Sequence, residues 1–447
     1  MHAVAKYLER HAEPERALAD AVDGRYERAI VVPTFCEDPA FVDGLVPAVK
    51  ASRGRTLAIV VVNARVDAST AAHDENARSL AGLVGRLDGA RRVARTPNAW
   101  LGAEPDSPLD VLVVDRATAG ARLPKKQGVG LARKIGTDVA LSLHVTGKVA
   151  SRFLFGTDAD ATLPEGHFDL TEVERDSDVA AAVFPFWHDA GSDVHLTDAT
   201  ALYELWLRYY VLGLAWAGSP YAFHTLGSAT AVSAAAYAGV RGFPKREAAE
   251  DFYLLNKIAK VGKILRARGA PVRLASRASE RTPFGTGRRV AETIAVGVRD
   301  FYAPEAFSTL RSVVRACDSF AEHADVERFF ADVAALAPAP RSVTLAFLNE
   351  LDARRVLATV SREIETCDAR RRRVHSWFDA FRTLKLIHAL RDRCFPSVRW
   401  HAAIELAPFC APTASGDPVM SVRARLASAE RDLPLYAGPT VPSLTCK

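Results

Sequence analysis

The sequence predicts an α/β protein in which a mostly parallel sheet, flanked by helices, is followed by a helical C-terminal region. In the first two thirds, short apolar runs rich in β-branched residues alternate with segments of helical period. Beyond about residue 300, strand-like runs become hard to find. The chain has 447 residues, 49% hydrophobic and 25% charged, which is typical of a soluble globular protein and excludes disordered and collagen-like classes.

Four apolar runs predict the strands of the sheet: Ala29–Pro33, Leu57–Val62, Val111–Val114 and Phe153–Phe155. Helix-period segments lie between the first three runs and before the fourth, which favours parallel strands joined by covering helices. In such sheets ligands bind beyond the carboxyl ends of the strands. We therefore expect functional residues directly after the strands, at 34–38, 63–67, 115–118 and 158–160.

The remaining segments suggest a division into an N-terminal helical segment (1–28), an α/β domain (29–300) and a helical C-terminal region (301–447). The most apolar stretch, Thr200–Trp216, is interrupted by Glu204 and Arg208, so it predicts a buried or interfacial helix. The spacing of apolar residues predicts a helix over 343–364. Six prolines in the last 40 residues predict an extended, loosely attached tail.

Charge and cysteine content restrict the partners and the compartment. The net charge is +5, but residues 341–447 carry 17 basic and 11 acidic side chains, so the rest is nearly neutral and we predict no nucleic-acid partner. Charged residues throughout Met1–Arg16 exclude a signal peptide there, and we expect a cytoplasmic protein. Six cysteines without a CxxC pair predict free thiols. The aromatic helix and basic tail permit peripheral contact with the inner membrane surface.

The strongest local motif is Asp158-Ala159-Asp160, which directly follows an apolar strand. In extended backbone the side chains of residues i and i+2 point the same way, so both carboxylates can address one hard cation and the phosphates that it bridges. The alternative is an ordinary polar turn.

Two further motifs open predicted helices. Glu250-Asp251 precedes an apolar helix, where acidic residues favour the helix dipole and where a carboxylate could act as a general base. Gly128 and Gly130 precede Arg133 and Lys134, an arrangement that would let an anion approach backbone amides near positive charge. Neither the dinucleotide fingerprint nor the P-loop pattern is present.

Taken in order, the motifs resemble those of family 2 glycosyltransferases of the GT-A fold. The matching segments are AIVVPTFCED at 29–38, the Ala132-Arg133 helix, the Asp158–Asp160 triplet, GSATAVSAAAYAGVRG at 227–242, and Glu250-Asp251 before an apolar helix. The resemblance covers about residues 29–290.

The resemblance implies an inverting, metal-dependent enzyme that moves a hexose from a nucleotide-diphosphate sugar, such as a UDP- or GDP-sugar, to an acceptor hydroxyl. By position, Asp158 and Asp160 would hold Mg²⁺ or Mn²⁺, and Asp251 would be the general base with Glu250 beside it. The residues that would bind the donor are Pro33, Thr34, Phe35, Glu37, Asn63, Arg133, Lys134, Asp158, Gly227, Ser228 and Arg288.

Alternatives stay open at this stage. The loop 279–289, with Arg281, Arg288 and Arg289, could close over a diphosphate or be an exposed basic loop. A sugar-1-phosphate nucleotidyltransferase also uses paired carboxylates on a parallel sheet, although its Gly- and Lys-rich loop is absent after the first strand. A non-catalytic sugar-nucleotide-binding or scaffold protein would keep the same fold. A retaining reaction, the acceptor and the oligomeric state are not decided by the sequence.

Overall fold

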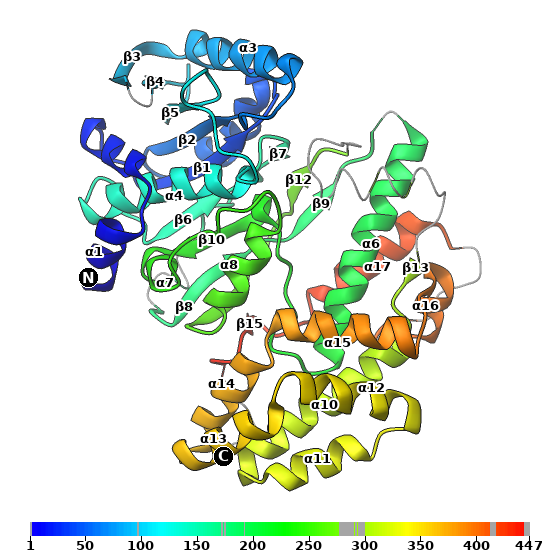
Figure 1. The fold of residues 1–447 in the computed structure, drawn as a ribbon. Helices are drawn as coiled ribbons and strands as arrows, with labels where there is room; N and C mark the ends of the chain where they lie inside the picture. The colour runs from blue at the N-terminus through cyan, green and yellow to red at the C-terminus, as the bar shows by residue number, and fades with distance from the viewer. Residues whose placement is uncertain are drawn as a thin grey trace. The chain divides into compact units, whose positions relative to one another are not determined.

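The computed structural model describes residues 2–95, 98–170, 173, 176–191, 193–276, 290, 293, 300–411 and 417–441. The chain forms two compact units (Figure 1). The sheet unit comprises Met1–Gly191 and Thr225–Arg288, and the helical unit comprises Ser192–His224 and Arg289–Lys447. Each unit is therefore built from two separate stretches of sequence.

The sheet unit is organised around a large mixed sheet with the strand order β11-β8-β10-β6-β1-β2-β5-β4-β3. Strands β6, β1, β2 and β5 are parallel to one another, whereas β10 is antiparallel to β6 and β4 is antiparallel to β5. A small second sheet has the order β7-β12-β9. The strands are β1 (Arg28–Thr34), β2 (Thr56–Asn63), β3 (Asp88–Arg95), β4 (Asn98–Ala103), β5 (Leu109–Arg116), β6 (Phe153–Gly156), β7 (Ala161–Thr162), β8 (Val179–Val183), β9 (Phe186–His188), β10 (Thr230–Ser233), β11 (Lys263–Arg266) and β12 (Val272–Leu274).

The four strands predicted from apolar runs are confirmed as β1, β2, β5 and β6. Every residue of β1 and β2 is buried, as expected for central parallel strands covered on both faces. The helices of this unit are α1 (His2–Arg10), α2 (Val46–Lys50), α3 (Thr70–Arg86), α4 (Val129–Val145), α7 (Ala234–Gly239) and α8 (Glu250–Ile258), with short 3₁₀ turns at Pro14–Ala21, Pro39–Gly44 and Gly227–Ala229.

The order of the parallel strands creates a switch point between β1 and β6. The chain moves from β1 to β2 to β5, and α4 then carries it back to β6 on the other side of β1. Helix α3 contacts β2 and β5, while α4 contacts β1, β2 and β6. Because parallel crossovers are right-handed, the reversal places α3 and α4 on opposite faces. Ligands of open α/β sheets bind at such a switch point.

The helical unit encloses its own apolar core. Helix α6 packs on α10, where Tyr209 meets Phe307 with ring centroids 5.6 Å apart. A Cβ atom on Gly213 would lie 2.5 Å from the Phe307 ring, so glycine allows this close approach. The elements are α6 (Val194–Trp216), β13 (Asp300–Phe301), α10 (Pro304–His323), α11 (Val326–Ala334), α12 (Pro338–Glu350), α13 (Ala353–Glu363), α14 (Cys367–Trp377), α15 (Ala380–Arg393), β14 (Val398–Arg399), α16 (Trp400–Leu406), α17 (Val419–Glu430) and β15 (Tyr436–Ala437).

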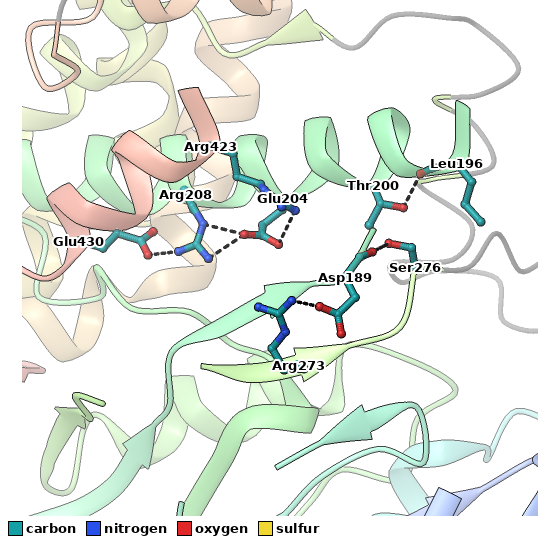
Figure 2. A network of polar contacts seen from close by, with 9 residues as sticks. All are labelled: Asp189, Leu196, Thr200, Glu204, Arg208, Arg273, Ser276, Arg423 and Glu430. Carbon is teal, nitrogen blue, oxygen red and sulfur yellow. Dashed lines mark hydrogen bonds and ion pairs between the residues drawn. The ribbon is translucent and has the colours of Figure 1, made fainter. Parts of the chain in front are cut away.

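The two charged residues that interrupt the apolar sequence of α6 belong to a buried ionic network (Figure 2). Glu204 accepts hydrogen bonds from Arg208 at 2.8 and 3.0 Å and from Arg423 of α17 at 3.3 Å. Arg208 also bonds Glu430, which lies 2.7 Å from Nε2 of His224. Burial would raise the pKa of Glu430, but His224 and Arg208 hold this pKa below its ordinary value. The charged side chains of α6 therefore bind α17 through ion pairs with Arg423 and Glu430.

The predicted helix over 343–364 is wrong in one respect. It is divided into α12 and α13 at Leu351–Asp352, where Asp352 has a left-handed φ of 52° that no α-helix continues through.

The predicted loose tail is also wrong for residues 419–430, which form α17 and bury Val422 and Leu426. Cys36, Cys317, Cys394 and Cys410 are free, as expected, but Cys367 takes part in a disulfide bond, so the prediction of free thiols fails there. Within the described part of the chain, no helix combines the length and the apolar character needed to cross a bilayer.

Candidate functional site

Arg133 of α4 is the centre of the candidate site. Its guanidinium is buried and reaches the loop after β6, the turn before β10 and the start of α8. Nε donates to Glu250 Oε1 at 2.9 Å, and Nη1 donates to the carbonyl oxygens of Gly227 at 3.1 Å and Thr157 at 3.3 Å. Nη2 forms an ion pair with Asp158. One side chain thus joins three segments, the most distant of which lies 117 residues from Arg133 in the sequence.

The loop after β6 places Asp158 beside this guanidinium. Thr157 continues the parallel pairing, since its amide donates to Val31 of β1 at 3.1 Å, and its hydroxyl donates to the Ser228 carbonyl at 2.9 Å. Asp158 follows with a side chain that is 34% exposed, whereas that of Arg133 is 5% exposed. The carboxylate of Asp158 is therefore accessible at the switch point of the sheet.

Gly227 and Ser228 form the turn that faces this loop. The Gly227 amide donates to Asp251 Oδ2 at 2.9 Å, while its carbonyl accepts from Arg133. A Cβ atom on Gly227 would lie 2.4 Å from Nη2 of Arg133, so a larger residue would meet the guanidinium. Through its amide and its carbonyl, this one residue joins the surroundings of Asp158 to those of Asp251.

Glu250 and Asp251 begin helix α8 but have different environments. Glu250 is buried and pairs with Arg133. Asp251 is half-buried, and its carboxylate accepts from the amides of Gly227 and, at 2.7 Å, Phe252. Ala249, just before the helix, has a left-handed φ of 59°, a conformation that costs a non-glycine residue about 1–2 kcal/mol. The backbone is thus constrained at the point where both carboxylates emerge.

The charges of this cluster are unbalanced. Asp158, Glu250 and Asp251 surround the one guanidinium of Arg133, and although burial disfavours its charge, the three carboxylates together raise the pKa of Arg133. Burial and the neighbouring Glu250 raise the pKa of Asp251 to about 7, although Arg133 and the two backbone amides act in the opposite direction. Asp251 is therefore suited to take up and release a proton near neutral pH.

Lys134, the neighbour of Arg133, points elsewhere. Its ammonium contacts Tyr7 Oη at 2.5 Å and Asp138 Oδ2 at 2.9 Å, and Tyr7 donates to Asp138 at 2.6 Å. The amide of Glu13 also donates to Asp138, at 2.8 Å. Successive side chains on a helix diverge by about 100°, so the structure brings Arg133 but not Lys134 to the cluster. Lys134 instead attaches the N-terminal segment to α4.

The predicted nucleoside-binding segment lies at the ends of β1 and β2. Pro33 and Thr34 complete β1, and Asn63 at the end of β2 donates to the Thr34 carbonyl at 2.8 Å. Thr34 is buried, and its hydroxyl has no hydrogen-bond partner within the described residues. Phe35 and Glu37 are half-buried in the loop that follows, where the Glu37 carbonyl accepts from Ser79 of α3. These residues occupy the same edge of the sheet as Asp158.

Other predicted positions have more varied outcomes. Asp160 is half-buried two residues beyond Asp158, and its carbonyl accepts from the amide of Ala275. Arg288 and the loop 279–289 lie outside the described residues. The expected anion approach at the start of α4 is contradicted, because a Cβ on Gly130 would lie 2.6 Å from the Pro244 carbonyl, and the Gly130 amide donates to Arg246. These small residues admit the backbone of 244–246.

Sequence reasoning missed one contribution to the site and overestimated another residue. Thr157 holds the turn at Ser228 through its hydroxyl and Arg133 through its carbonyl, and its place directly before Asp158 was the only available signal. Asp115, expected to be functional because it follows β5, instead accepts from the amides of Ala117 and Thr118 and stabilises a turn.

The sequence matches no protein-family model and no curated protein. Among solved structures, the chain is similar to the mannosyltransferase PcManGT from Pyrobaculum calidifontis in complex with GDP-Man and Mn²⁺. The two are 19% identical with a TM-score of 0.33, over 85% of this chain and 92% of that chain. A likeness of this degree does not assign the present chain to a family.

Proposed function

We propose that this protein is a metal-dependent glycosyltransferase of the GT-A type that transfers a hexose from a nucleotide-diphosphate donor to an acceptor hydroxyl with inversion. The observation that carries the proposal is that two carboxylates with different hydrogen-bond partners, Asp158 and Asp251, lie on either side of Gly227 at the switch point of the sheet. Inverting transfer needs such a pair, one acidic group near the leaving diphosphate and another near the acceptor.

The residues present fit a divalent cation. Asp158 and Asp160 offer carboxylate oxygens, the donors that Mg²⁺ and Mn²⁺ prefer, and the cluster around Arg133 carries more negative than positive charge. Among the described residues, no three His, Cys, Asp or Glu side chains are grouped to hold a metal. Mg²⁺ is usually bound by one or two carboxylates, and substrate phosphates complete its coordination. Such a metal would neutralise charge on the departing diphosphate.

Asp251 is the general base in this proposal. Its carboxylate is held by the Gly227 and Phe252 amides, and burial together with Glu250 raises its pKa to about 7, so it can accept the proton of an acceptor hydroxyl. Glu250 forms a buried ion pair with Arg133 and acts as a positioning residue. Pro33, Thr34, Phe35, Glu37 and Asn63 would line the nucleoside site.

A donor screen tests this proposal. Thermal unfolding is measured with UDP-, GDP- and dTDP-sugars, each with and without Mn²⁺, and release of the nucleoside diphosphate is followed by chromatography. We expect one donor class to raise the melting temperature only with the metal. Asp251→Asn should keep this shift and lose 10²–10⁴-fold in turnover, the range for removal of a general base.

The outcomes separate the alternatives. A metal-dependent rise in melting temperature without turnover in the unmodified protein, for every acceptor class tried, would favour a non-catalytic sugar-nucleotide-binding or scaffold protein. Release of inorganic diphosphate from a nucleoside triphosphate and a sugar phosphate would favour the nucleotidyltransferase. Unchanged turnover in Asp251→Asn would remove Asp251 as the base.

A further inference from the structure

The ion pair between Arg133 and Asp158 has a consequence for how the site takes up its ligands. Each nitrogen of the Arg133 guanidinium has a partner, and one of these partners is the carboxylate assigned to the metal. A divalent cation and a guanidinium compete for the same oxygens, because both are attracted by the same negative charge.

The partners of Arg133 differ in how firmly they are fixed. Glu250 is 5% exposed and lies in the first turn of α8, whereas the Asp158 side chain is 34% exposed and lies in a loop. Gly227 and Thr157 hold Nη1 through backbone carbonyls. The contact with Asp158 is therefore the exchangeable one, and the other three would keep the guanidinium in place if Asp158 turned away.

Resting on the proposed function, we propose that Arg133 is the resident counter-cation of the donor site. It holds Asp158 until a metal–diphosphate complex binds. Asp158 then exchanges the guanidinium for the metal, while Glu250 and the Gly227 carbonyl retain Arg133 beside the diphosphate. No bond is made or broken in this exchange apart from ionic contacts. It follows that the metal alone binds weakly and that the diphosphate supplies the charge that the exchanged Arg133 requires.

Binding of Mn²⁺ alone, followed by the electron paramagnetic resonance signal of the free ion, tests the competition. Because removing Arg133 would leave Glu250 as an unpaired buried charge, the substitution is made in a Glu250→Gln background. We expect Arg133→Gln/Glu250→Gln to bind Mn²⁺ about tenfold more tightly than Glu250→Gln alone, since the metal no longer has to displace a charge-assisted hydrogen bond from Asp158. Adding Asp158→Asn should abolish the gain. An equal or weaker Mn²⁺ affinity in the double variant would overturn the proposal, as would a gain that survives Asp158→Asn.

A second variant removes the contact without changing any charge. In Gly227→Ala, the new Cβ would lie 2.4 Å from Nη2, 2.6 Å from Cζ and 3.0 Å from Nε of Arg133, so the whole guanidinium would have to move and its contact with Asp158 should be lost. We expect Mn²⁺ to bind more tightly here as well, with circular dichroism unchanged. A folded Gly227→Ala variant that binds Mn²⁺ like the unmodified protein would contradict the proposal.

Inorganic diphosphate tests the second half of the proposal, that Arg133 stays beside the diphosphate. With Mn²⁺ and diphosphate together, measured by calorimetry with the preformed complex, Glu250→Gln should bind more tightly than Arg133→Gln/Glu250→Gln, the reverse of the order for Mn²⁺ alone. The same order in both experiments would refute a phosphate role for Arg133. Neither measurement uses a nucleotide sugar or an acceptor, so a failed donor screen and a failed competition are distinct results.

Discussion

His167 provides a test of how burial controls stability in the sheet unit. Its side chain is 3% exposed and lies among Phe155, Phe168 and Phe184, with ring centroids 6.1, 5.2 and 4.2 Å away. Neither ring nitrogen has a hydrogen-bond partner in the described part of the chain. Burial lowers the pKa of His167 to about 3, so the imidazole stays neutral in the folded protein at ordinary pH.

The expected effect of pH follows from linkage. In the unfolded chain the imidazole has its usual pKa of about 6.5, so as pH falls below that value the unfolded state gains a proton that the folded state does not. The titration of His167 therefore leaves the free energy of unfolding unchanged above pH 6.5 and lowers it as the pH falls toward about 3. Each pH unit corresponds to about 1.4 kcal/mol, which makes the loss about 2 kcal/mol at pH 5 relative to pH 8.

His167→Phe removes this dependence. At pH 8 the variant should be about 1–3 kcal/mol more stable, because an unpaired buried N–H is replaced by an apolar edge. At pH 5 the advantage should grow by about 2 kcal/mol. Urea unfolding at both pH values measures the change, with hydrogen exchange of the β6 amides to report on the sheet unit, and His11→Phe, at an exposed position, serves as the control. Equal losses for the unmodified protein and His167→Phe between pH 8 and pH 5 would refute the reasoning.

Three other predictions concern the site and the buried charges. Turnover should rise with pH through about 7, because Asp251 must lose its proton before it can act as a base; a pH–rate profile that is flat from 6 to 8 would contradict this. Glu204→Gln should destabilise the helical unit by about 3–5 kcal/mol, because two buried guanidinium groups lose a carboxylate, while the exposed Glu405→Gln should change the free energy of unfolding by less than about 0.5 kcal/mol. Tyr7→Phe should cost about 1–3 kcal/mol, since Asp138 and Lys134 lose the hydroxyl between them; an unchanged urea midpoint would mean that water replaces it fully.

Strand prediction succeeded where burial leaves a clear pattern. The β-branched runs of β1, β2 and β5 are buried on both faces, so their sequences are continuously apolar and their ends are predicted to within two residues. Strand β3, by contrast, has the sequence DGARRVAR and is mostly exposed, so its hairpin with β4 has no apolar alternation to reveal it. The grouping of α6 with helices more than 80 residues away was also not predictable, because chain order carries no record of tertiary partners.

The site was predicted in part for similar reasons. The motifs at Asp158 and Glu250-Asp251 directly follow or begin regular elements, so their positions could be expected from the sheet alone. The sequence could not predict which of the two adjacent basic residues faces the cluster, because Arg133 and Lys134 differ only in their direction around α4. That Glu250 rather than Asp251 pairs with Arg133 depends on one turn of α8 and on the strained φ of Ala249.

The interleaving of the two units along the chain bears on how the protein is made. Helix α6 emerges from the ribosome before β10, β11 and β12 and long before α10, on which Tyr209 packs. At about 5–20 residues per second, α6 waits some 5–20 s for the roughly 110 residues that complete α10. During that interval its aromatic and aliphatic face is exposed, so we expect ribosome-bound chains that end before residue 300 to recruit chaperones, and chains that extend past residue 430 to release them.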